Sequence, residues 1–111
     1  YILLDRFYDA SIAYQGYGRN LSISLINSLI SFIKCPEPDV SFLLDIPVED
    51  GFARKKNDKK DRIESSSIAF FNRVRDGYLT IAKENDNRFT IIDASMGINE
   101  IHMKIIDTLN T

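Results

Sequence analysis

The chain has a single cysteine, Cys35, a single histidine, His102, and only short apolar runs. One cysteine excludes an internal disulfide and fits a reducing compartment, so we expect a cytoplasmic protein. One histidine leaves no cluster of metal ligands and gives no support for a Ser-His-Asp nucleophile system. The apolar runs are far shorter than the roughly 20 residues that span a bilayer, so we expect no membrane contact.

Neither sign of charge is in large excess, because the formal net charge is -2. This balance gives no overall bias toward nucleic acid, and we expect no nucleic-acid partner. The apolar fraction of 44% and the charged fraction of 27% are ordinary for a globular protein. A length of 111 residues suits one domain or part of one.

A phosphate loop is also absent from the sequence. The pattern G-x-x-x-x-G-K-[ST] places backbone amides and a lysine around nucleotide phosphates. Gly16 and Gly18 give only Gly-Tyr-Gly, and no Gly-Lys pair occurs. These residues alone therefore lack the part that holds the ATP phosphates in many phosphoryl-transfer enzymes.

Three segments share one pattern, an apolar run followed by an acid. They are Tyr1-Ile2-Leu3-Leu4-Asp5, Ser41-Phe42-Leu43-Leu44-Asp45 and Thr90-Ile91-Ile92-Asp93. Continuous apolar character is typical of strands that are buried on both faces of a parallel sheet. The pattern predicts three such strands.

Helical spacing of apolar residues separates the predicted strands. One helix, capped by Asn20, is predicted to place on one face Leu21, Leu25, Ile26, Leu29, Ile30 and Ile33. A short helix follows Pro47, and a last helix begins near Asn99 and buries Ile101, Ile105 and Leu109. Between them, a long helix over about 66–83 is predicted to face inward with Ile68, Phe71, Val74, Tyr78 and Ile81, its aromatic residues as core.

The predicted order is strand, helix, strand, helix, helix, strand, helix. Parallel strands joined by helical crossovers form a sheet with helices on both faces, so the fold class is α/β. No repeat, low-complexity tract or linker divides the sequence. We therefore predict a single domain.

Asp5 and Arg6 follow the first predicted strand, at the position where open α/β sheets bind their ligands. The planar guanidinium of an arginine can grip a phosphate, and a carboxylate can hold a metal ion through water. Ser11, Tyr14 and Gln15 lie at spacings of three and four, which would place them on one helical face. A hydroxyl, an aromatic ring and a carboxamide suit a pyrimidine deoxynucleotide.

Asp5-Arg6-Phe7 and Ala13-Tyr14-Gln15-Gly16 closely resemble the Asp-Arg-Tyr/His motif and the Ala-Tyr-Gln-Gly segment of bacterial thymidylate kinases. Asp61-Arg62-Ile63-Glu64 resembles a further segment of that family, and Asp93-Ala94-Ser95 resembles its Asp-Ala-Ser turn near adenine. The resemblance implies a three-layer P-loop kinase-type fold and transfer of the ATP γ-phosphoryl to dTMP, giving dTDP and ADP for dTTP synthesis. It also implies Mg²⁺ as cofactor, ATP as co-substrate and a homodimer.

The same resemblance implies roles for single residues. Arg6 would bind the nucleoside monophosphate, and Asp5 would lie near Mg²⁺ and hold it through water. Ser11 and Gln15 would contact thymine, and Tyr14 would line the deoxyribose. Phe7 replaces the usual Tyr or His, which removes a polar group from the motif.

Six basic residues lie among the nine of segment 54–62. Such a run is otherwise typical of a solvated loop, a localisation-like patch or a nucleic-acid contact. In the family, this place is the LID, a loop that closes over ATP, here about 53–64. Positive charge around the γ-phosphate and exclusion of water both favour phosphoryl transfer. The resemblance assigns to ATP and the LID Arg54, Lys55, Lys56, Lys59, Lys60 and Glu64, with Arg54 near adenine, and it adds Arg62 to the catalytic residues Asp5 and Arg6.

In the resembled fold, the strand with the phosphate loop lies between the first and second strands predicted here. We therefore expect residues 1–111 to be the C-terminal portion of one nucleoside monophosphate kinase domain. Alone, this portion is expected to be unstable and inactive, because buried strand edges would lack partners. Two alternatives stay open: a kinase for another nucleoside monophosphate, and a kinase-derived interaction module without catalysis.

Overall fold

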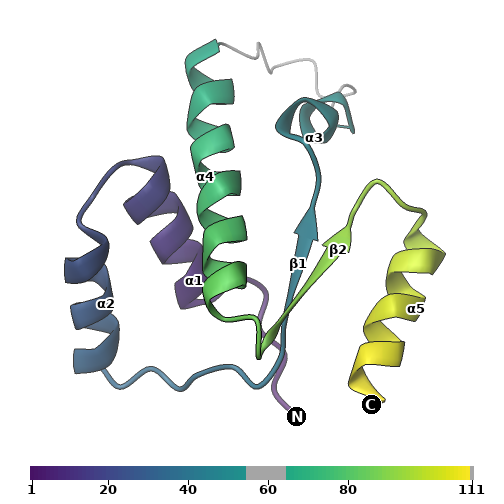
Figure 1. Cartoon of the computed structure of the whole chain (residues 1–111), viewed down its shortest axis with the longest axis horizontal. Coiled ribbons are helices and arrows are strands. Elements are labelled where there is room, and N and C mark those ends of the chain that lie inside the picture. Colours follow the sequence, from purple (N-terminus) through teal and green to yellow (C-terminus); the bar gives the residue numbers. More distant parts are fainter. Residues whose placement is uncertain (55–64, 111) are drawn as a thin grey trace.

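The computed structural model describes residues 1–54 and 65–110 (Figure 1). In chain order its elements are α1 (Tyr8–Ser11), the π-helix η1 (Ile12–Gly18), α2 (Ile23–Phe32), β1 (Ser41–Asp45), α3 (Val48–Arg54), α4 (Ser65–Glu84), β2 (Phe89–Asp93) and α5 (Ile98–Leu109). Apart from the first strand, this order confirms the predicted alternation of helices and strands.

β1 and β2 form a parallel sheet in which Ser41 lies opposite Phe89 and Asp45 lies opposite Asp93. Both strands are continuous apolar runs that end on an acid, as predicted. α4 packs against both strands, and α5 packs against β2. In Figure 1, α5 lies on the opposite side of the strands from α1, α2 and α4. The predicted α/β arrangement with helices on both sides of the sheet is confirmed.

The prediction of a strand over residues 1–4 is wrong in this structure. The segment has no regular structure and its side chains are exposed, Leu4 least of them at 59%. A strand is held by main-chain hydrogen bonds to a neighbouring strand, and β1 and β2 pair with each other instead. The described residues therefore form a sheet of two strands where three were predicted.

The hydrophobic core lies between η1 and α4. Ile12 and Ala13 from η1 pack with Val74 and Ile81 from α4. The other residues predicted to face inward from the long helix are half-buried, namely Ile68, Phe71 and Tyr78. The predicted inward face of α4 is confirmed. This face packs against η1.

Two glycines allow η1 and α4 to lie this close. A Cβ atom on Gly18 would stand 2.8 Å from both Phe70 Cε1 and Val74 Cγ2. A Cβ atom on Gly77 would stand 2.5 Å from Tyr17 Cβ. Separations this short force neighbouring atoms to move, so a larger residue at either position would push the two helices apart.

α2 departs from the prediction in its cap and in its buried face. The Ser22 hydroxyl, and not Asn20, caps the helix by accepting a hydrogen bond from the Leu25 N–H at 3.2 Å. Asn20 instead has a left-handed backbone with φ 57°. Ile26 and Ile30 pack against the core, because only one side of the helix faces η1. The other four residues predicted to be buried are exposed, namely Leu21, Leu25, Leu29 and Ile33.

α5 begins at Ile98, close to the predicted start, with Gly97 as its N-cap. Ile101 and Ile105 are half-buried, whereas Leu109 near the end of the helix is exposed, contrary to the prediction. Across 1–54 and 65–110, no helix is both long and apolar enough to cross a membrane.

Candidate functional site

Arg6 has a φ of 65°, in the left-handed region that non-glycine residues rarely adopt. Asp5 and Arg6 lie in a bend just before α1, and both are exposed. Backbone strain of this kind persists only where the surroundings hold it, and it clusters at functional sites. The Asp-Arg motif therefore forms a strained turn that presents an acid and a guanidinium to solvent.

A buried ion pair anchors α1 to the start of β2. Arg88 Nη1 and Nη2 donate hydrogen bonds to the Asp9 carboxylate at 2.9 and 3.0 Å, and Nη1 also donates to Ser41 Oγ at 3.0 Å. The guanidinium carbon lies 5.7 Å from the ring centroid of Tyr8 and 4.7 Å from that of Phe89. The bond to Asp9 raises the pKa of Arg88. Two parallel charge-assisted bonds fix both position and orientation, so the start of α1 is held firmly.

The Arg6 guanidinium lies over the Tyr14 ring, with 4.7 Å between its central carbon and the ring centroid. This cation–π contact joins the predicted phosphate-binding arginine to the predicted sugar-contacting ring. Tyr14 is half-buried and meets Phe70, Phe71 and Tyr78 of α4 at centroid distances of 6.1, 6.4 and 6.2 Å. The packing of these α4 rings against Tyr14 restricts the position of its side chain.

Tyr14 and Gln15 belong to the π-helix η1, in which the Arg19 N–H donates to the Tyr14 carbonyl oxygen at 3.0 Å. Stretches of π-helix are rare in proteins, and those that occur are often found at functional sites. Ser11, at the end of α1, and Gln15 are exposed, whereas Tyr14 packs against α4. The two side chains predicted to contact a base are thus accessible to a ligand.

Tyr78 was predicted as a core residue and packs against the core, but its contact with the Tyr14 ring was not predicted. Its ring stands at 86° to the Tyr14 ring, and the side chain is half-buried. Burial raises the pKa of Tyr78 and the neighbouring Tyr14 adds to this, whereas the positive charge of Arg6 acts in the opposite direction. The sequence signal that could have drawn attention to Tyr78 is a tyrosine at an inward helical position, because a buried tyrosine hydroxyl usually needs a hydrogen-bond partner.

A second polar group lies where β1 and β2 end. Because the strands are parallel and in register, Asp45 and Asp93 come together at the edge where α/β sheets bind ligands. Arg75 of α4 donates two hydrogen bonds to the Asp45 carboxylate, from Nε at 2.8 Å and from Nη2 at 3.1 Å. These bonds raise the pKa of Arg75 and tie the middle of α4 to the end of β1.

Arg54, at the end of α3, reaches the turn that follows β2. Its Nη2 donates a hydrogen bond to the Ala94 carbonyl oxygen at 2.6 Å. In the same turn, the Asp93 carboxylate accepts from the Ser95 hydroxyl at 2.6 Å and from the Ser95 N–H at 2.9 Å, which lowers the pKa of Asp93. The two segments predicted to surround adenine therefore meet. The other predicted ATP, LID and catalytic residues lie outside the described residues, namely Lys55, Lys56, Lys59, Lys60, Arg62 and Glu64.

The side chains available to a magnesium ion are few. Within the part of the chain that the structure describes, no group of three or more His, Cys, Asp or Glu side chains could hold a metal ion. Asp5 offers one exposed carboxylate beside Arg6. Mg²⁺ in kinase sites typically takes one or two carboxylates together with waters and substrate phosphates. Asp5 fits an ion held mainly by nucleotide and water rather than by a protein cage.

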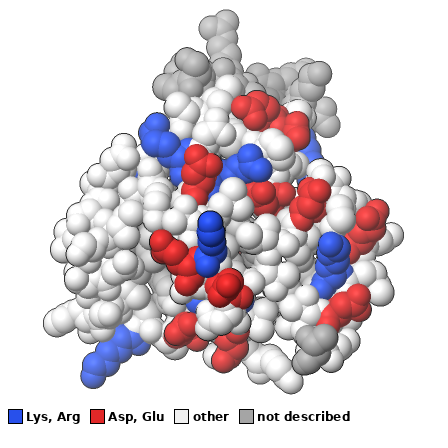
Figure 2. Space-filling view, viewed as in Figure 1, with Lys and Arg blue, Asp and Glu red and all other residues white. Residues whose placement is uncertain are grey.

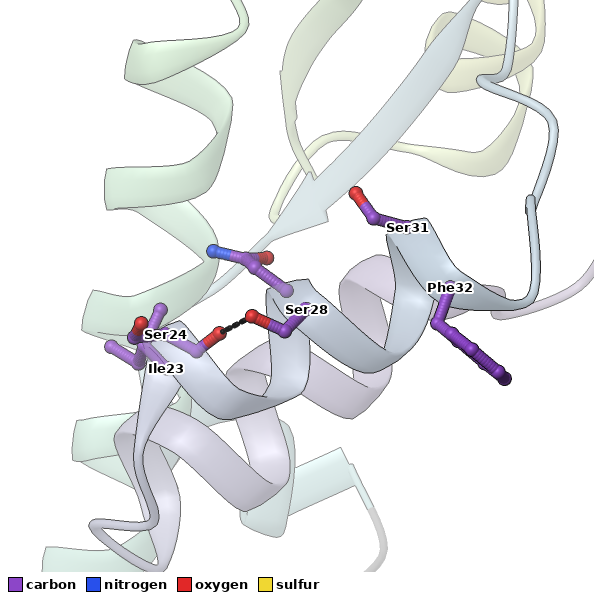
Figure 3. A pocket seen from close by; sticks show the side chains of 6 residues that line it. Ile23, Ser24, Ser28, Ser31 and Phe32 are labelled. Carbon is purple, nitrogen blue, oxygen red and sulfur yellow. Dashed lines mark hydrogen bonds between the residues drawn. The ribbon is translucent and has the colours of Figure 1, made fainter.

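A shallow groove of about 840 Å³ follows α2. Figure 3 shows the residues that line it, namely Ile23, Ser24, Asn27, Ser28, Ser31 and Phe32. The Ser28 hydroxyl donates to the Ser24 carbonyl oxygen at 2.9 Å, so its hydrogen is used within the helix. Figure 2 shows a largely uncharged surface over α2, with basic and acidic residues interspersed elsewhere on this face. None of the predicted site residues lines the groove, and it is not part of the candidate site.

Comparison with known proteins gives consistent matches. A family model described as thymidylate kinase matches residues 1–105. The thymidylate kinase of Prosthecochloris aestuarii is 42% identical over 119 residues, which cover 97% of this chain and 53% of that protein. The thymidylate kinase of Kosmotoga olearia is 41% identical over 107 residues, covering 95% of this chain and 51% of that protein. The crystal structure of thymidylate kinase from Ehrlichia chaffeensis matches with a TM-score of 0.69 and 34% identity, over 96% of this chain and 47% of that one. The chain spans about half the length of the curated relatives it matches.

Proposed function

This chain belongs to the thymidylate kinase family, and we propose that the protein containing it transfers the γ-phosphoryl group of ATP to dTMP. The products would be dTDP and ADP. The α/β arrangement corresponds to part of the P-loop kinase-type fold of this family. Because the 111 residues contain no phosphate-loop motif, the proposal concerns the whole protein, and these residues alone are expected to be inactive.

The observation that carries the proposal is the Arg6 guanidinium stacked over Tyr14 at a strained turn, 4.7 Å from the ring centroid. An exposed guanidinium beside a packed aromatic ring is suited to a ligand in which a phosphate is joined to a sugar. The guanidinium would bind the phosphate of dTMP through charge-assisted hydrogen bonds, and the ring would pack against the deoxyribose.

Ser11 and Gln15 would recognise the base. Both are exposed and flank Tyr14 in sequence, at the junction of α1 and η1. A carboxamide can donate and accept at once, and thymine offers both a carbonyl oxygen and an N–H. Gln15 can therefore pair with the edge of thymine, and the choice of dTMP over other nucleoside monophosphates follows the family resemblance.

The ATP side of the site would be formed by Arg54 and the turn after β2. Arg54 is held on the Ala94 carbonyl oxygen, which supports a place for both beside adenine. For the residues outside the described part, the proposal follows the family. Lys55, Lys56, Lys59 and Lys60 would surround the γ-phosphate, Glu64 would belong to the same loop, and Arg62 would act with Asp5 and Arg6 in catalysis.

Transfer of a phosphoryl group requires little covalent help from the protein, so positioning and charge carry most of the catalysis. Arg6 would hold the acceptor phosphate in line, and Asp5 would orient Mg²⁺ through water. When bound, Mg²⁺ neutralises the negative charge that develops on the phosphates. Basic side chains of the LID would add positive charge, and closure of the loop would exclude water.

A panel of acceptors tests the proposal. ADP release from ATP and Mg²⁺ would be measured for the whole protein with dTMP, dUMP, dCMP or dGMP. We expect the highest kcat/KM for dTMP, and Gln15→Ala should lower kcat/KM for dTMP about tenfold while changing the other acceptors less. Equal use of all acceptors would overturn the choice of dTMP, and the absence of any acceptor-dependent ADP release would overturn the kinase assignment. Assembly as a homodimer stays a prediction, which sedimentation of the whole protein tests.

A further inference from the structure

The turn that follows β2 is held by hydrogen bonds on both sides of Ala94. The Ala94 N–H donates to the main-chain carbonyl oxygen of Asp45 at 2.8 Å, and the Ala94 carbonyl oxygen accepts from Arg54 Nη2 at 2.6 Å. Ala94 itself is buried. Buried main-chain groups need their hydrogen-bond partners in place, so the position of this turn depends on where Asp45 and Arg54 lie.

Asp45, the last residue of β1, is in turn held by α4. Arg75 donates to the Asp45 carboxylate from Nε at 2.8 Å and from Nη2 at 3.1 Å. Two parallel charge-assisted bonds fix the orientation of the carboxylate as well as its distance. The side chains of Arg75 and Asp45 are only 33% and 20% exposed, so the pair is partly shielded from water. Arg75 therefore restrains the same residue whose carbonyl oxygen binds the Ala94 N–H.

The second support of the turn also leads back to α4. Arg54 ends α3, and α3 packs on α4 through the rings of Phe52 and Phe71, whose centroids lie 5.4 Å apart at 78°. Phe71 precedes Arg75 by four residues, which places both on one face of α4. Both hydrogen-bond partners of Ala94 are thus restrained by neighbouring turns of the same helix.

This face of α4 also contacts the acceptor side of the candidate site. The Phe71 and Tyr78 rings meet the Tyr14 ring at centroid distances of 6.4 and 6.2 Å. Phe71, Arg75 and Tyr78 follow each other at spacings of four and three along the helix. One helix face therefore packs on Tyr14 and binds Asp45. Because phosphoryl transfer requires donor and acceptor to be placed accurately, a helix that contacts both sides can set their relative position.

We propose that Arg75 is a positioning residue for ATP, which acts through Asp45 to fix the turn at Ala94 relative to α4. The identity of the ligand as ATP, and the place of its adenine beside this turn, rest on the proposed function. Arg75 acts through the Asp45 carboxylate and not by contact with the nucleotide. Its loss should weaken ATP binding and leave dTMP binding unchanged, because the acceptor is expected to contact Arg6 and Tyr14.

The test is the steady-state kinetics of the whole protein, with ATP and dTMP varied in turn. Arg75→Gln should raise the KM for ATP about fivefold and leave the KM for dTMP unchanged. Arg75→Lys keeps the charge but cannot form two parallel bonds, so it should give most of the same rise, and it provides the test if Arg75→Gln does not fold. The matched control, Asp9→Asn, weakens the arginine–aspartate pair with Arg88 at the opposite ends of the strands. It should lower the stability but leave the KM for ATP unchanged.

A double-mutant cycle with Asp45→Asn tests the route of the effect. If Arg75 acts through Asp45, each single substitution should raise the KM for ATP to a similar extent, and the double variant should be no worse than either. Additive effects would overturn the inference, as would an unchanged KM for ATP or equal rises in both KM values. A wild-type protein without dTMP-dependent ADP release would overturn the proposed function itself, so the two failures are distinguishable.

Discussion

The Arg88 guanidinium donates two parallel hydrogen bonds to the Asp9 carboxylate, at 2.9 and 3.0 Å, and so joins the first turn of α1 to the start of β2. The Arg88 side chain is only 4% exposed. Removing Asp9 leaves the buried Arg88 charge, among the described residues, with only the exposed Glu37 carboxylate, 3.5 Å from Arg88 Nε. Asp9→Ala should therefore lower the free energy of unfolding of the whole protein by about 3 kcal/mol, measured by urea denaturation.

The double substitution Asp9→Leu with Arg88→Met removes both charges and should cost less than Asp9→Ala alone. Asp107→Ala, on the exposed side of α5, serves as a control and should change the free energy of unfolding by less than about 0.5 kcal/mol. A loss below about 1 kcal/mol for Asp9→Ala would show that the pair does not anchor α1.

The close approach of α4 to η1 predicts the effect of alanine at Gly77. Alanine gains about 1 kcal/mol of helix propensity over glycine, but here its Cβ would lie 2.5 Å from Tyr17 Cβ. Overpacking of this kind costs about 1–3 kcal/mol, so Gly77→Ala should be destabilising on balance. Thermal unfolding would show a lower melting temperature.

Gly51 on α3 is the matched glycine. An added Cβ there would meet only Ile46 Cγ2, at an ordinary 3.7 Å. Gly51→Ala should therefore raise the free energy of unfolding by up to about 1 kcal/mol. If both alanine variants shift the melting temperature in the same direction, the steric account of Gly77 is wrong.

The hydrogen bond from Arg54 to the Ala94 carbonyl oxygen predicts an effect on ATP alone. Arg54→Ala frees the turn after β2 and removes a group expected beside adenine. The KM for ATP should rise about tenfold, with the KM for dTMP unchanged, in steady-state assays of the whole protein. Lys83→Ala, an exposed basic residue in the last turn of α4, should alter neither constant. A parallel rise in both KM values would indicate general damage to the fold.

The Asp93–Ser95 turn predicts a specific pH dependence. Hydrogen bonds from Ser95 lower the pKa of Asp93 in the folded protein. Because the folded pKa is below the unfolded value of about 3.9, the bonds stabilise the fold above that pH, and this stabilisation is lost as the pH falls through the lowered pKa. Ser95→Ala should raise the pKa of Asp93 in a carboxyl NMR titration, whereas Ser95→Thr should leave it low. An unchanged pKa in Ser95→Ala would show that the hydroxyl bond is not formed.

The predicted strands show where sequence patterns suffice and where they fail. Continuous apolar runs identified β1 and β2, because both find a partner within the described residues. The same pattern at 1–4 forms no strand, since pairing depends on a neighbour that a local pattern does not contain. For α2, Asn20 was predicted as the cap but Ser22 caps the helix, and packing against η1 decided which side of the helix is buried.

Only some contacts among the candidate site residues could be expected from the sequence. Motif resemblance placed Arg6 and Tyr14 in one site, and the structure brings them into contact. Tyr78 packs against the core as its helical spacing predicted, but that spacing does not show that its ring meets Tyr14. Asp9 and Arg88 lie too far apart in sequence for any local pattern to link them. The apolar spacing that predicts a helix does not distinguish the π-helix η1 from an α-helix.

The most direct test of the account follows the phosphoryl group itself. The whole protein would be incubated with Mg²⁺, ATP labelled at the γ-phosphate, and dTMP, and the products would be separated. We predict that the label appears in dTDP, that no labelled nucleotide product other than ATP forms without dTMP, and that Arg6→Ala reduces the labelled dTDP at least about tenfold. Release of labelled inorganic phosphate regardless of dTMP, with no labelled dTDP, would contradict the assignment of this protein as a thymidylate kinase.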